Sequence, residues 1–327
     1  MHKIKTAVIG VGNMGVYHTR VYSQLNNTDL IAVADTNETV GIKIAQKFNC
    51  RYYKDYNKLL KEENIDAVSI AVPSKLHKRV ALDVIGHGKH LLIEKPIAIN
   101  SRDAKEIIIM AQKRKVILMI GHIERFNPAV QKLKEMIKAG NLGSIISIIA
   151  RRVGISAPQI NDSNIMIDLA IHDIDILNYL LNGHATEVFV KGRTVLTSQK
   201  NDSIEMMLSY DKVIGFIQAD WITPIKIRNL SVTGSNGYIE LNYITQTLNL
   251  YQSKYIRRLD GFIKFGEPIT ERIKIQKKEP LLCELKAFMR CIIEKTQPLT
   301  TGEDGLKALI IAEKALKSLE YNKIIKI

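Results

Sequence analysis

The sequence predicts an α/β fold in two parts: a doubly wound parallel sheet, then an α+β domain with a large open-faced, mainly antiparallel sheet. In the first 120 residues, continuous apolar strands alternate with amphipathic helices, as in a parallel sheet covered on both faces. After Gly121, strand-like segments follow one another with few helices between them. The length of 327 residues suits two domains of roughly 100–200 residues each.

The elements of the first part are short apolar runs and the amphipathic stretches between them. The expected strands are Ile4–Gly10, Leu30–Asp35, Ala67–Val72, His90–Ile93 and Val116–Ile120. The expected helices are Met14–Leu25, Glu38–Phe48, Leu76–Gly86 and Ser101–Arg114. Right-handed crossovers join such strands into a doubly wound sheet, which we place in residues 1–121.

The second part, residues 122–327, is expected to form one sheet with helices on one face. The expected helices are Pro128–Ala139, Ile167–Leu181, Glu279–Ile293 and Glu303–Leu319. The expected strands are Ile145–Val153, Glu187–Val195, Ser203–Tyr210, Val213–Trp221, Asn229–Thr233, Tyr238–Asn242, Gln246–Gln252 and Glu271–Ile275. Such an open sheet leaves an apolar face to cover, so we expect a homodimer or homotetramer.

The composition is that of a globular protein, with 46% hydrophobic and 24% charged residues. The net charge is +14, but the lysines are scattered along the chain and no basic run is interleaved with aromatic residues. We therefore expect no nucleic-acid partner, and we interpret the positive balance as suited to small anionic ligands such as a dinucleotide.

Three features predict a cytoplasmic protein with no membrane partner. No apolar run reaches the length of about 18 residues that a membrane span needs. The first ten residues lack the long apolar stretch and the cleavage site of a signal peptide. The cysteines Cys50, Cys283 and Cys291 match no zinc signature and are too sparse for a disulfide framework, which indicates a reducing compartment.

A glycine-rich turn follows the first strand and opens the first helix. Its glycines, Gly10, Gly12 and Gly15, have the G-x-G-x-x-G spacing of a dinucleotide-binding Rossmann fold. The first glycine permits the tight turn, the second lets the backbone approach a pyrophosphate, and the third allows close packing of helix and strand. The helix N-terminus then offers free amides to the phosphates, so we expect Asn13 and Met14 at the cofactor too.

The end of the second strand predicts which dinucleotide binds. Asp35 lies about 20 residues after the motif, where an acid can hydrogen-bond the ribose 2′-hydroxyl. No arginine follows that could hold a 2′-phosphate, since the next residues are Thr36 and Asn37. The sequence therefore predicts NAD rather than NADP. The alternative is a glycine turn with an unrelated surface aspartate.

Glu94-Lys95-Pro96 follows the apolar strand that ends at Ile93. This position puts Lys95 at the carboxyl end of a strand, where doubly wound folds bind ligands. There a lysine can hydrogen-bond a substrate hydroxyl, and Glu94 can orient it. A solvent-exposed lysine at a strand end is the competing interpretation.

A second cluster contains Asp168, His172 and Asp175. On a helix, Asp168 and His172 are four residues apart and share a face, and Asp175 lies on the same side. A carboxylate beside an imidazole can fix its tautomer, as a proton-transfer residue requires. Two alternatives stay open: a capped helix start with a satisfied core histidine, and a metal site.

Together these pieces resemble the glucose–fructose oxidoreductase/inositol dehydrogenase (Gfo/Idh/MocA) family. The resemblance covers essentially the whole chain and implies a Rossmann domain followed by a substrate-binding and oligomerisation domain. It also implies that the catalytic residues are Lys95, Asp168 and His172, with no metal. The matching residues that it assigns to the cofactor, besides the glycine motif, are Val72, Pro73, His77, Glu94 and Lys95.

Within that family, three stretches look like UDP-N-acetylglucosamine 3-dehydrogenases: residues 121–128, 150–154 and 167–175. The residues expected to contact a UDP-sugar substrate are Lys95, Arg125, Asn127, Arg151, Arg152, Asp168 and His172. Arg125 and either Arg151 or Arg152 are expected at the diphosphate or sugar oxygens, because a guanidinium suits phosphate. Salt bridges at the surface or between domains are the alternative for the arginines. The stretch 154–162 departs from the pattern, since it has a single proline where a proline-rich loop is expected.

The predicted reaction is oxidation of a secondary hydroxyl of a sugar, C3 of UDP-N-acetylglucosamine, to a ketone with NAD. His172, held by Asp168, is expected to take the hydroxyl proton while Lys95 stabilises the negative charge on the oxygen. Which of Lys95 and His172 takes the proton stays open. The alternatives are a dehydrogenase of a free sugar, an inositol or another cyclic polyol, and a non-catalytic NAD-binding protein.

Overall fold

The computed structural model describes all residues except 1–2, 156–163, 197–200, 253–254 and 258–262. The chain forms two compact units: residues 1–126 with 279–309, and residues 127–278 with 310–327. The predicted single boundary after residue 121 is therefore wrong for residues 279–309, which rejoin the first unit. The reason is packing, because helix α8 (Pro280–Glu294) buries Leu285 and Phe288 in the same cluster as Val21 and Tyr22.

The first unit is built on a six-stranded parallel sheet with the order β3-β2-β1-β4-β5-β6. Its strands are β1 (Ile4–Ile9), β2 (Thr28–Ala34), β3 (Arg51–Tyr53), β4 (Ala67–Ile70), β5 (His90–Glu94) and β6 (Leu118–Gly121). The order reverses between β1 and β4, so their carboxyl ends flank a crevice in which such sheets bind ligands. The predicted doubly wound sheet is confirmed, and the short β3 is an addition to it.

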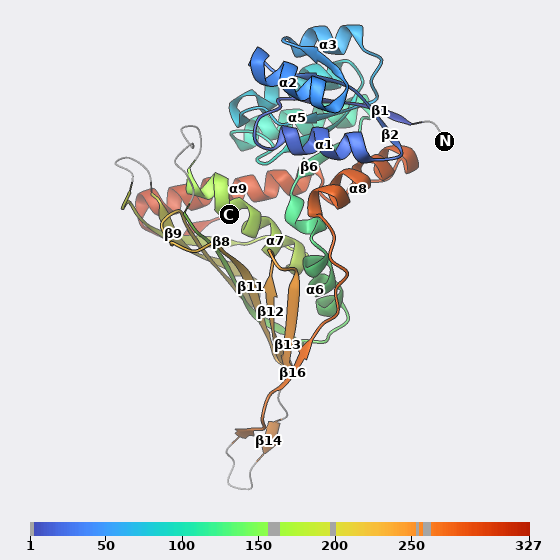
Figure 1. Cartoon of the computed structure of the whole chain (residues 1–327). Helices are drawn as coiled ribbons and strands as arrows, with labels where there is room; N and C mark the ends of the chain where they lie inside the picture. The colour runs from blue at the N-terminus through green and yellow to red at the C-terminus, as the bar shows by residue number, and fades with distance from the viewer. Residues whose placement is uncertain (1–2, 156–163, 197–200, 253–254, 258–262) are drawn as a thin grey trace. The chain divides into compact units, whose positions relative to one another are not determined.

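Helices cover both faces of this sheet (Figure 1). They are α1 (Gly15–Gln24), α2 (Glu38–Phe48), α3 (Tyr56–Glu62), α4 (His77–Gly86) and α5 (Ser101–Arg114), with α8 added from the C-terminal part. Two short 3₁₀ turns, Ser74–Leu76 and Ile123–Phe126, follow β4 and β6. The sequence prediction missed β3 and α3, because segments this short show little periodicity.

The second unit is built on a nine-stranded sheet with the order β16-β13-β12-β11-β7-β10-β9-β8-β17. Among the described strands of this sheet, only β7 and β10 pair in parallel, so the prediction of a mainly antiparallel sheet is confirmed. The strands are β7 (Ile145–Val153), β8 (Glu187–Arg193), β9 (Ser203–Tyr210), β10 (Val213–Asp220), β11 (Ile227–Gly234), β12 (Gly237–Asn242), β13 (Thr247–Gln252), β16 (Ile269–Arg272) and β17 (Ile325–Lys326). A separate hairpin pairs β14 (Tyr255–Arg257) with β15 (Ile263–Phe265).

Helices of this unit pack on one face of its sheet (Figure 1). They are α6 (Pro128–Lys138) and α7 (Ile171–Leu181), and α9 (Gly302–Tyr321) enters the unit at residue 310. Strand alternation separates the two faces: Ile148 and Ala150 are buried on the helix side, whereas Ile149 and Arg151 are exposed on the other. The predicted strand at 271–275 lies slightly earlier, at β16, and β14, β15 and β17 were not predicted.

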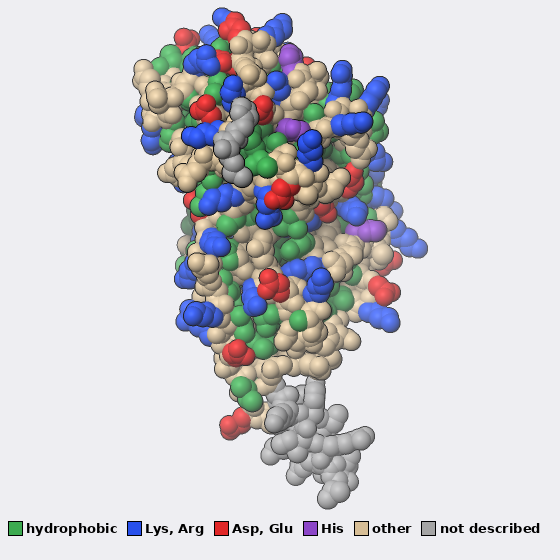
Figure 2. Space-filling model, turned by 90° about the vertical axis from the view of Figure 1, so that its right-hand side faces the viewer, with side chains coloured by type: hydrophobic (Ala, Val, Ile, Leu, Met, Phe, Trp, Pro, Cys, Tyr) green, Lys and Arg blue, Asp and Glu red, His purple; other side chains and the backbone are tan. Residues whose placement is uncertain are grey.

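The surface agrees with the scattered charge of the sequence. On the face in Figure 2, Lys and Arg side chains lie singly or in small groups among Asp and Glu. Among the described residues, no helix is both long enough and apolar enough to cross a membrane.

Candidate functional site

The glycine turn between β1 and α1 has the geometry that its spacing predicts. Gly10 adopts a positive φ of 86°, which a side chain disfavours. A Cβ on Gly15 would overlap the carbonyl oxygen of Gly10, so helix and strand meet more closely than any other residue allows. A Cβ on Gly12 would meet nothing within 4 Å, which leaves its backbone open to a ligand.

A cavity of about 330 Å³ lies in front of this turn. Its lining includes several of the predicted cofactor residues: Gly10, Gly12, Asp35, Val72 and Pro73. The open backbone of Gly12, the apolar walls and an acid at the end of β2 fit the adenosine half of a dinucleotide. Asn13 and Met14 are not in this lining, so their role at the cofactor stays a prediction.

Asp35 also holds the turn in place. Its two carboxylate oxygens accept hydrogen bonds from the amides of Val11 and Asn37, each at 2.8 Å. Two residues that sequence reasoning missed, Lys54 and Tyr56, line the same cavity. Lys54 directly follows β3 and Tyr56 begins α3, two elements too short to show a periodicity that could have placed them.

His77 does not line the cavity but lies behind Val72, which does. Its ring is buried, with Nδ1 2.8 Å from the carbonyl oxygen of Pro96 and Nε2 2.9 Å from that of Val72. Burial lowers the pKa of His77, although both carbonyls favour the charged ring. His77 is therefore a tie between the ends of β4 and β5, and we expect it to affect the cofactor through Val72 rather than by contact.

Lys95 directly follows β5, at the carboxyl edge of the sheet, as expected. The preceding Glu94 is buried, and its Oε2 accepts a hydrogen bond from the Lys95 amide at 3.2 Å. Its Oε1 lies 2.9 Å from Nε2 of His18. Burial raises the pKa of Glu94, but the hydrogen bond and charge of His18, with the charge of Lys95, outweigh it and hold the pKa below its usual value.

A second buried acid lies in the same unit. Glu284 of α8 is fully buried, and neither of its carboxyl oxygens has a hydrogen-bond partner among the described residues. Burial, together with the negative charge of Glu94, raises its pKa well above the usual value. Burial thus favours the neutral form of Glu284, whereas the charged form is favoured for Glu94.

The helix that carries Asp168 and His172 starts differently from the prediction. Residues Met166–Ala170 form a π-helical turn, and the α-helix begins only at Ile171. Such turns occur often at functional sites. The indole Nε1 of Trp221 donates to Oδ2 of Asp168 at 3.2 Å. Trp221 follows β10, 53 residues from its partner, and nothing local in the sequence indicates this bond.

The predicted substrate arginines divide into buried and exposed ones. Arg152 is buried and forms a two-point ion pair with Asp173, at 2.7 and 3.0 Å, beneath the ring of Tyr243 at 5.1 Å. Arg151 is exposed on the other face of the sheet, where its Nε donates to Gln218 at 2.8 Å. Adjacent strand residues point to opposite faces, so these two arginines cannot share one ligand.

Two more predicted substrate residues are used within their own units. Arg125 donates to the carbonyl oxygen of Leu299 at 3.0 Å and lies 3.3 Å from the carboxylate of Asp304. Asn127 caps α6 by accepting from the Ala129 amide, and it donates to the carbonyl oxygen of Tyr243. Arg125, Asn127 and Arg152 thus have partners within their own units, which favours the salt-bridge alternative for Arg125 and Arg152.

Two expectations concern other parts of the site. The loop with the single proline lies largely at 156–163, outside the described residues. Within the described part of the chain, no group of three or more His, Cys, Asp or Glu side chains is placed to hold a metal ion.

Comparison with known proteins matches both parts of the chain. Residues 4–122 match an oxidoreductase family with an NAD-binding Rossmann fold, and residues 130–240 match the GFO/IDH/MocA C-terminal domain. UDP-N-acetylglucosamine 3-dehydrogenase from Acidithiobacillus ferrooxidans is 28% identical, over 95% of this chain and 96% of its own. A solved structure of that enzyme has a TM-score of 0.87 at 26% identity, covering 98% of this chain and 99% of its own. Myo-inositol 2-dehydrogenase from Thermotoga maritima is 26% identical, over 99% of this chain and 98% of its own.

The glycine turn generates a prediction from two matched substitutions. Gly12→Ala should leave the stability nearly unchanged but weaken NADH binding at least about tenfold, because its methyl group enters the space where the pyrophosphate approaches. Gly15→Ala should cost about 1–3 kcal/mol of unfolding free energy, because the methyl group overpacks the turn. NADH fluorescence titration and urea unfolding measure the two effects. Normal NADH binding by G12A, or wild-type stability of G15A, contradicts the assigned roles.

The raised pKa of Glu284 predicts how stability depends on pH. Its folded pKa is raised above the usual 4.5, so its stabilising contribution is complete below that pH and is lost as the pH rises towards the folded value. Relative to Glu284→Gln, the wild type should lose up to about 1.4 kcal/mol per pH unit in this window. Urea unfolding from pH 4 to pH 9 measures the difference. Glu294→Gln, an exposed change on the same helix, is the control, and an identical pH dependence for both variants would refute the prediction.

Proposed function

Because the chain belongs to the Gfo/Idh/MocA oxidoreductase family, we propose that it oxidises C3 of UDP-N-acetylglucosamine to the 3-keto sugar with NAD. Membership confirms the predicted family, the NAD cofactor and the class of enzyme, a dehydrogenase acting on a CH–OH group. The observation that carries the proposal is the open glycine turn with Lys95 at the same carboxyl edge of the sheet. The full-length likeness to a UDP-N-acetylglucosamine 3-dehydrogenase supports the choice of substrate.

The likeness to a myo-inositol 2-dehydrogenase, also over nearly the whole chain, favours a second candidate. In this alternative the fold and the catalytic residues are the same, and the substrate is a free sugar, an inositol or another cyclic polyol. The two candidates differ in whether a diphosphate must be bound. Arg125 and Arg152 have internal partners, so we propose that they shape the site and do not hold a diphosphate.

The proposed reaction needs three protein groups. NAD, when bound, supplies the hydride acceptor. Lys95 donates a hydrogen bond to the reacting oxygen and stabilises the negative charge that develops on it. His172 takes the hydroxyl proton as general base. Asp168, whose carboxylate is fixed by Trp221, orients His172.

A substrate panel tests the proposed function. With NAD, the protein should form NADH on addition of UDP-N-acetylglucosamine, and more slowly or not at all with N-acetylglucosamine or myo-inositol. NADP should be a poorer cofactor, because Asp35 repels a 2′-phosphate. Faster turnover of myo-inositol than of the UDP-sugar would establish the second candidate. A clear preference for NADP would overturn the role of Asp35.

Matched variants in the same assay test the catalytic residues. Lys95→Ala and His172→Ala should each cut turnover by roughly 100-fold or more while NADH binding persists. The controls are Lys113→Ala and His184→Ala, which remove the same kinds of side chain from exposed positions. Near-normal turnover in both catalytic variants would refute the assignment.

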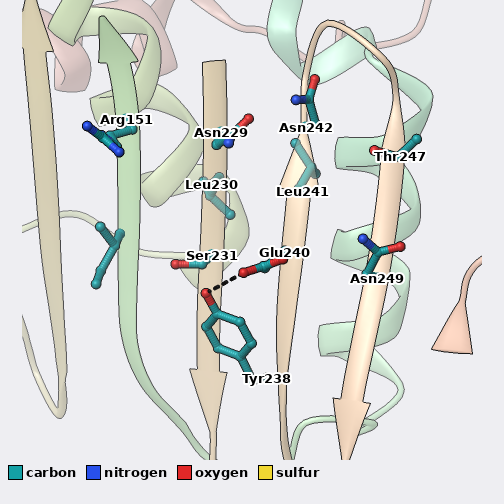
Figure 3. Close-up of a pocket in the computed structure, with 11 residues that line it drawn as sticks. Arg151, Asn229, Leu230, Ser231, Tyr238, Glu240, Leu241, Asn242, Thr247 and Asn249 are labelled. Carbon is teal, nitrogen blue, oxygen red and sulfur yellow. Dashed lines mark hydrogen bonds between the residues drawn. The ribbon is translucent and has the colours of Figure 1, made fainter. Parts of the chain in front are cut away.

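We also propose that the open face of the nine-stranded sheet joins copies of this chain. Ile149, Ile214 and Phe216 are exposed there on neighbouring strands, beside a shallow polar cavity of about 420 Å³. Figure 3 shows this polar part, with Ser231 and Glu240 projecting from adjacent strands. An apolar patch rimmed by polar groups is typical of an interface.

Light scattering tests the interface. The wild type should have a mass at least twice the 36.9 kDa of one chain, and Phe216→Lys should lower it by placing a charge in the patch. Arg290→Lys, a charge-conserving surface change, should leave the mass unaltered. A wild-type mass of one chain would rule the interface out.

A further inference from the structure

A row of buried hydrogen bonds runs through the first unit from α1 to the end of β5. The Tyr22 hydroxyl lies 2.8 Å from Oγ of Ser69, which lies 3.1 Å from Nδ1 of His18. Nε2 of the same ring lies 2.9 Å from Oε1 of Glu94, and Oε2 of Glu94 accepts from the Lys95 amide. The proposed reaction makes no use of His18, Ser69 or Tyr22.

These groups are buried. His18 and Ser69 are 0% exposed, and Glu94 is 8% exposed. In such an interior each hydrogen bond is stronger than in water, and losing one leaves a buried polar group unpaired. Gly121 leaves room for the carboxylate of Glu94, because a Cβ at Gly121 would lie 3.1 Å from its Oε2.

His18 links the start of α1 to the end of β5. It lies in the first turn of α1, which starts directly behind the glycine turn, and Gly10 and Gly12 of that turn line the dinucleotide cavity. Glu94, at the other end of its ring, immediately precedes Lys95. The imidazole therefore joins two segments 76 residues apart, one that would hold the cofactor and one that carries the proposed catalytic lysine.

We propose that His18 is a positioning residue: through Glu94 it fixes the main chain at Lys95 relative to the glycine turn. The inference rests on the proposed function, since it gives Lys95 its role. The competing role is a core histidine that only contributes stability. The two roles differ in which ring nitrogen matters, because only Nε2 reaches Glu94.

Two substitutions separate the ring nitrogens. The amide nitrogen of glutamine reaches about as far as Nε2, so His18→Gln keeps a donor to Glu94 and gives up Ser69. The shorter asparagine mimics Nδ1, so His18→Asn keeps Ser69 and gives up Glu94. Each variant loses one buried hydrogen bond, which makes them a matched pair for stability.

Hydrogen–deuterium exchange at the Lys95 amide measures, without any substrate, whether the contact between His18 and Glu94 fixes the main chain at Lys95. We expect exchange at least about tenfold faster in H18N than in the wild type, and within about threefold of the wild type in H18Q. Turnover with NAD and UDP-N-acetylglucosamine should fall by roughly 10- to 100-fold in H18N and be largely restored in H18Q. The KM for NAD should change little in either variant, because the glycine turn itself is intact.

The outcomes are distinct. Equal exchange at Lys95 in H18Q and H18N, or exchange that follows only the loss of melting temperature, would overturn the proposal and leave His18 a stabilising core residue. If H18N does not fold, His18→Met, which fills the space without either polar contact, takes its place with the same expectation. If exchange differs between H18N and H18Q as expected, but neither the wild type nor any variant makes NADH, the positioning role of His18 is supported and the proposed function is refuted.

Discussion

The close approach of helix α1 to the ends of the strands is the constraint on which the first unit depends. Gly15 packs against the carbonyl of Gly10 and against Ala71, so only a residue without a side chain lets the helix begin directly behind β1. The turn in front of that start places the open backbone of Gly12 at the cavity that Asp35 bounds. The start of α1 also brings the imidazole of His18, in the first turn of the helix, to Glu94.

The interior of this unit holds two carboxyl groups whose pKa values are shifted in opposite directions. Glu94 is paired with His18 and lies next to Lys95, so its charge is compensated and its pKa is lowered. Glu284 has no such partner among the described residues and faces the charge of Glu94, so its neutral form is favoured. The same residue type thus takes two roles, because the local environment and not the side chain sets its charge.

In the second unit, the sheet fixes the start of the helix that carries His172. Arg152 on β7 holds Asp173, the neighbour of His172, and Trp221 after β10 holds Asp168. Both bonds come from the helix-covered side of the sheet. Removing one partner of a buried ion pair costs about 3–5 kcal/mol, so we expect Arg152 to matter through this support rather than through a ligand.

Local patterns in the sequence determined much of this protein. Strand and helix periodicity predicted both sheets, and the spacing of Gly10, Gly12 and Gly15 predicted the turn, because these features depend on residues only a few positions apart. The same is true of Lys95, which directly follows an apolar strand. The cluster of Asp168 and His172 was also found in this way, and it stays a prediction as a catalytic pair.

Tertiary structure alone decided which polar side chains have partners. His18 meets Glu94 across 76 residues, Asp168 meets Trp221 across 53, and residues 279–309 return to the first unit. Sequence reasoning assigned Arg152 to a substrate, whereas the alternation along β7 turns it inward to Asp173. Such pairings follow from how sheets and helices stack, and no periodicity within a segment encodes which distant segment will pack against it.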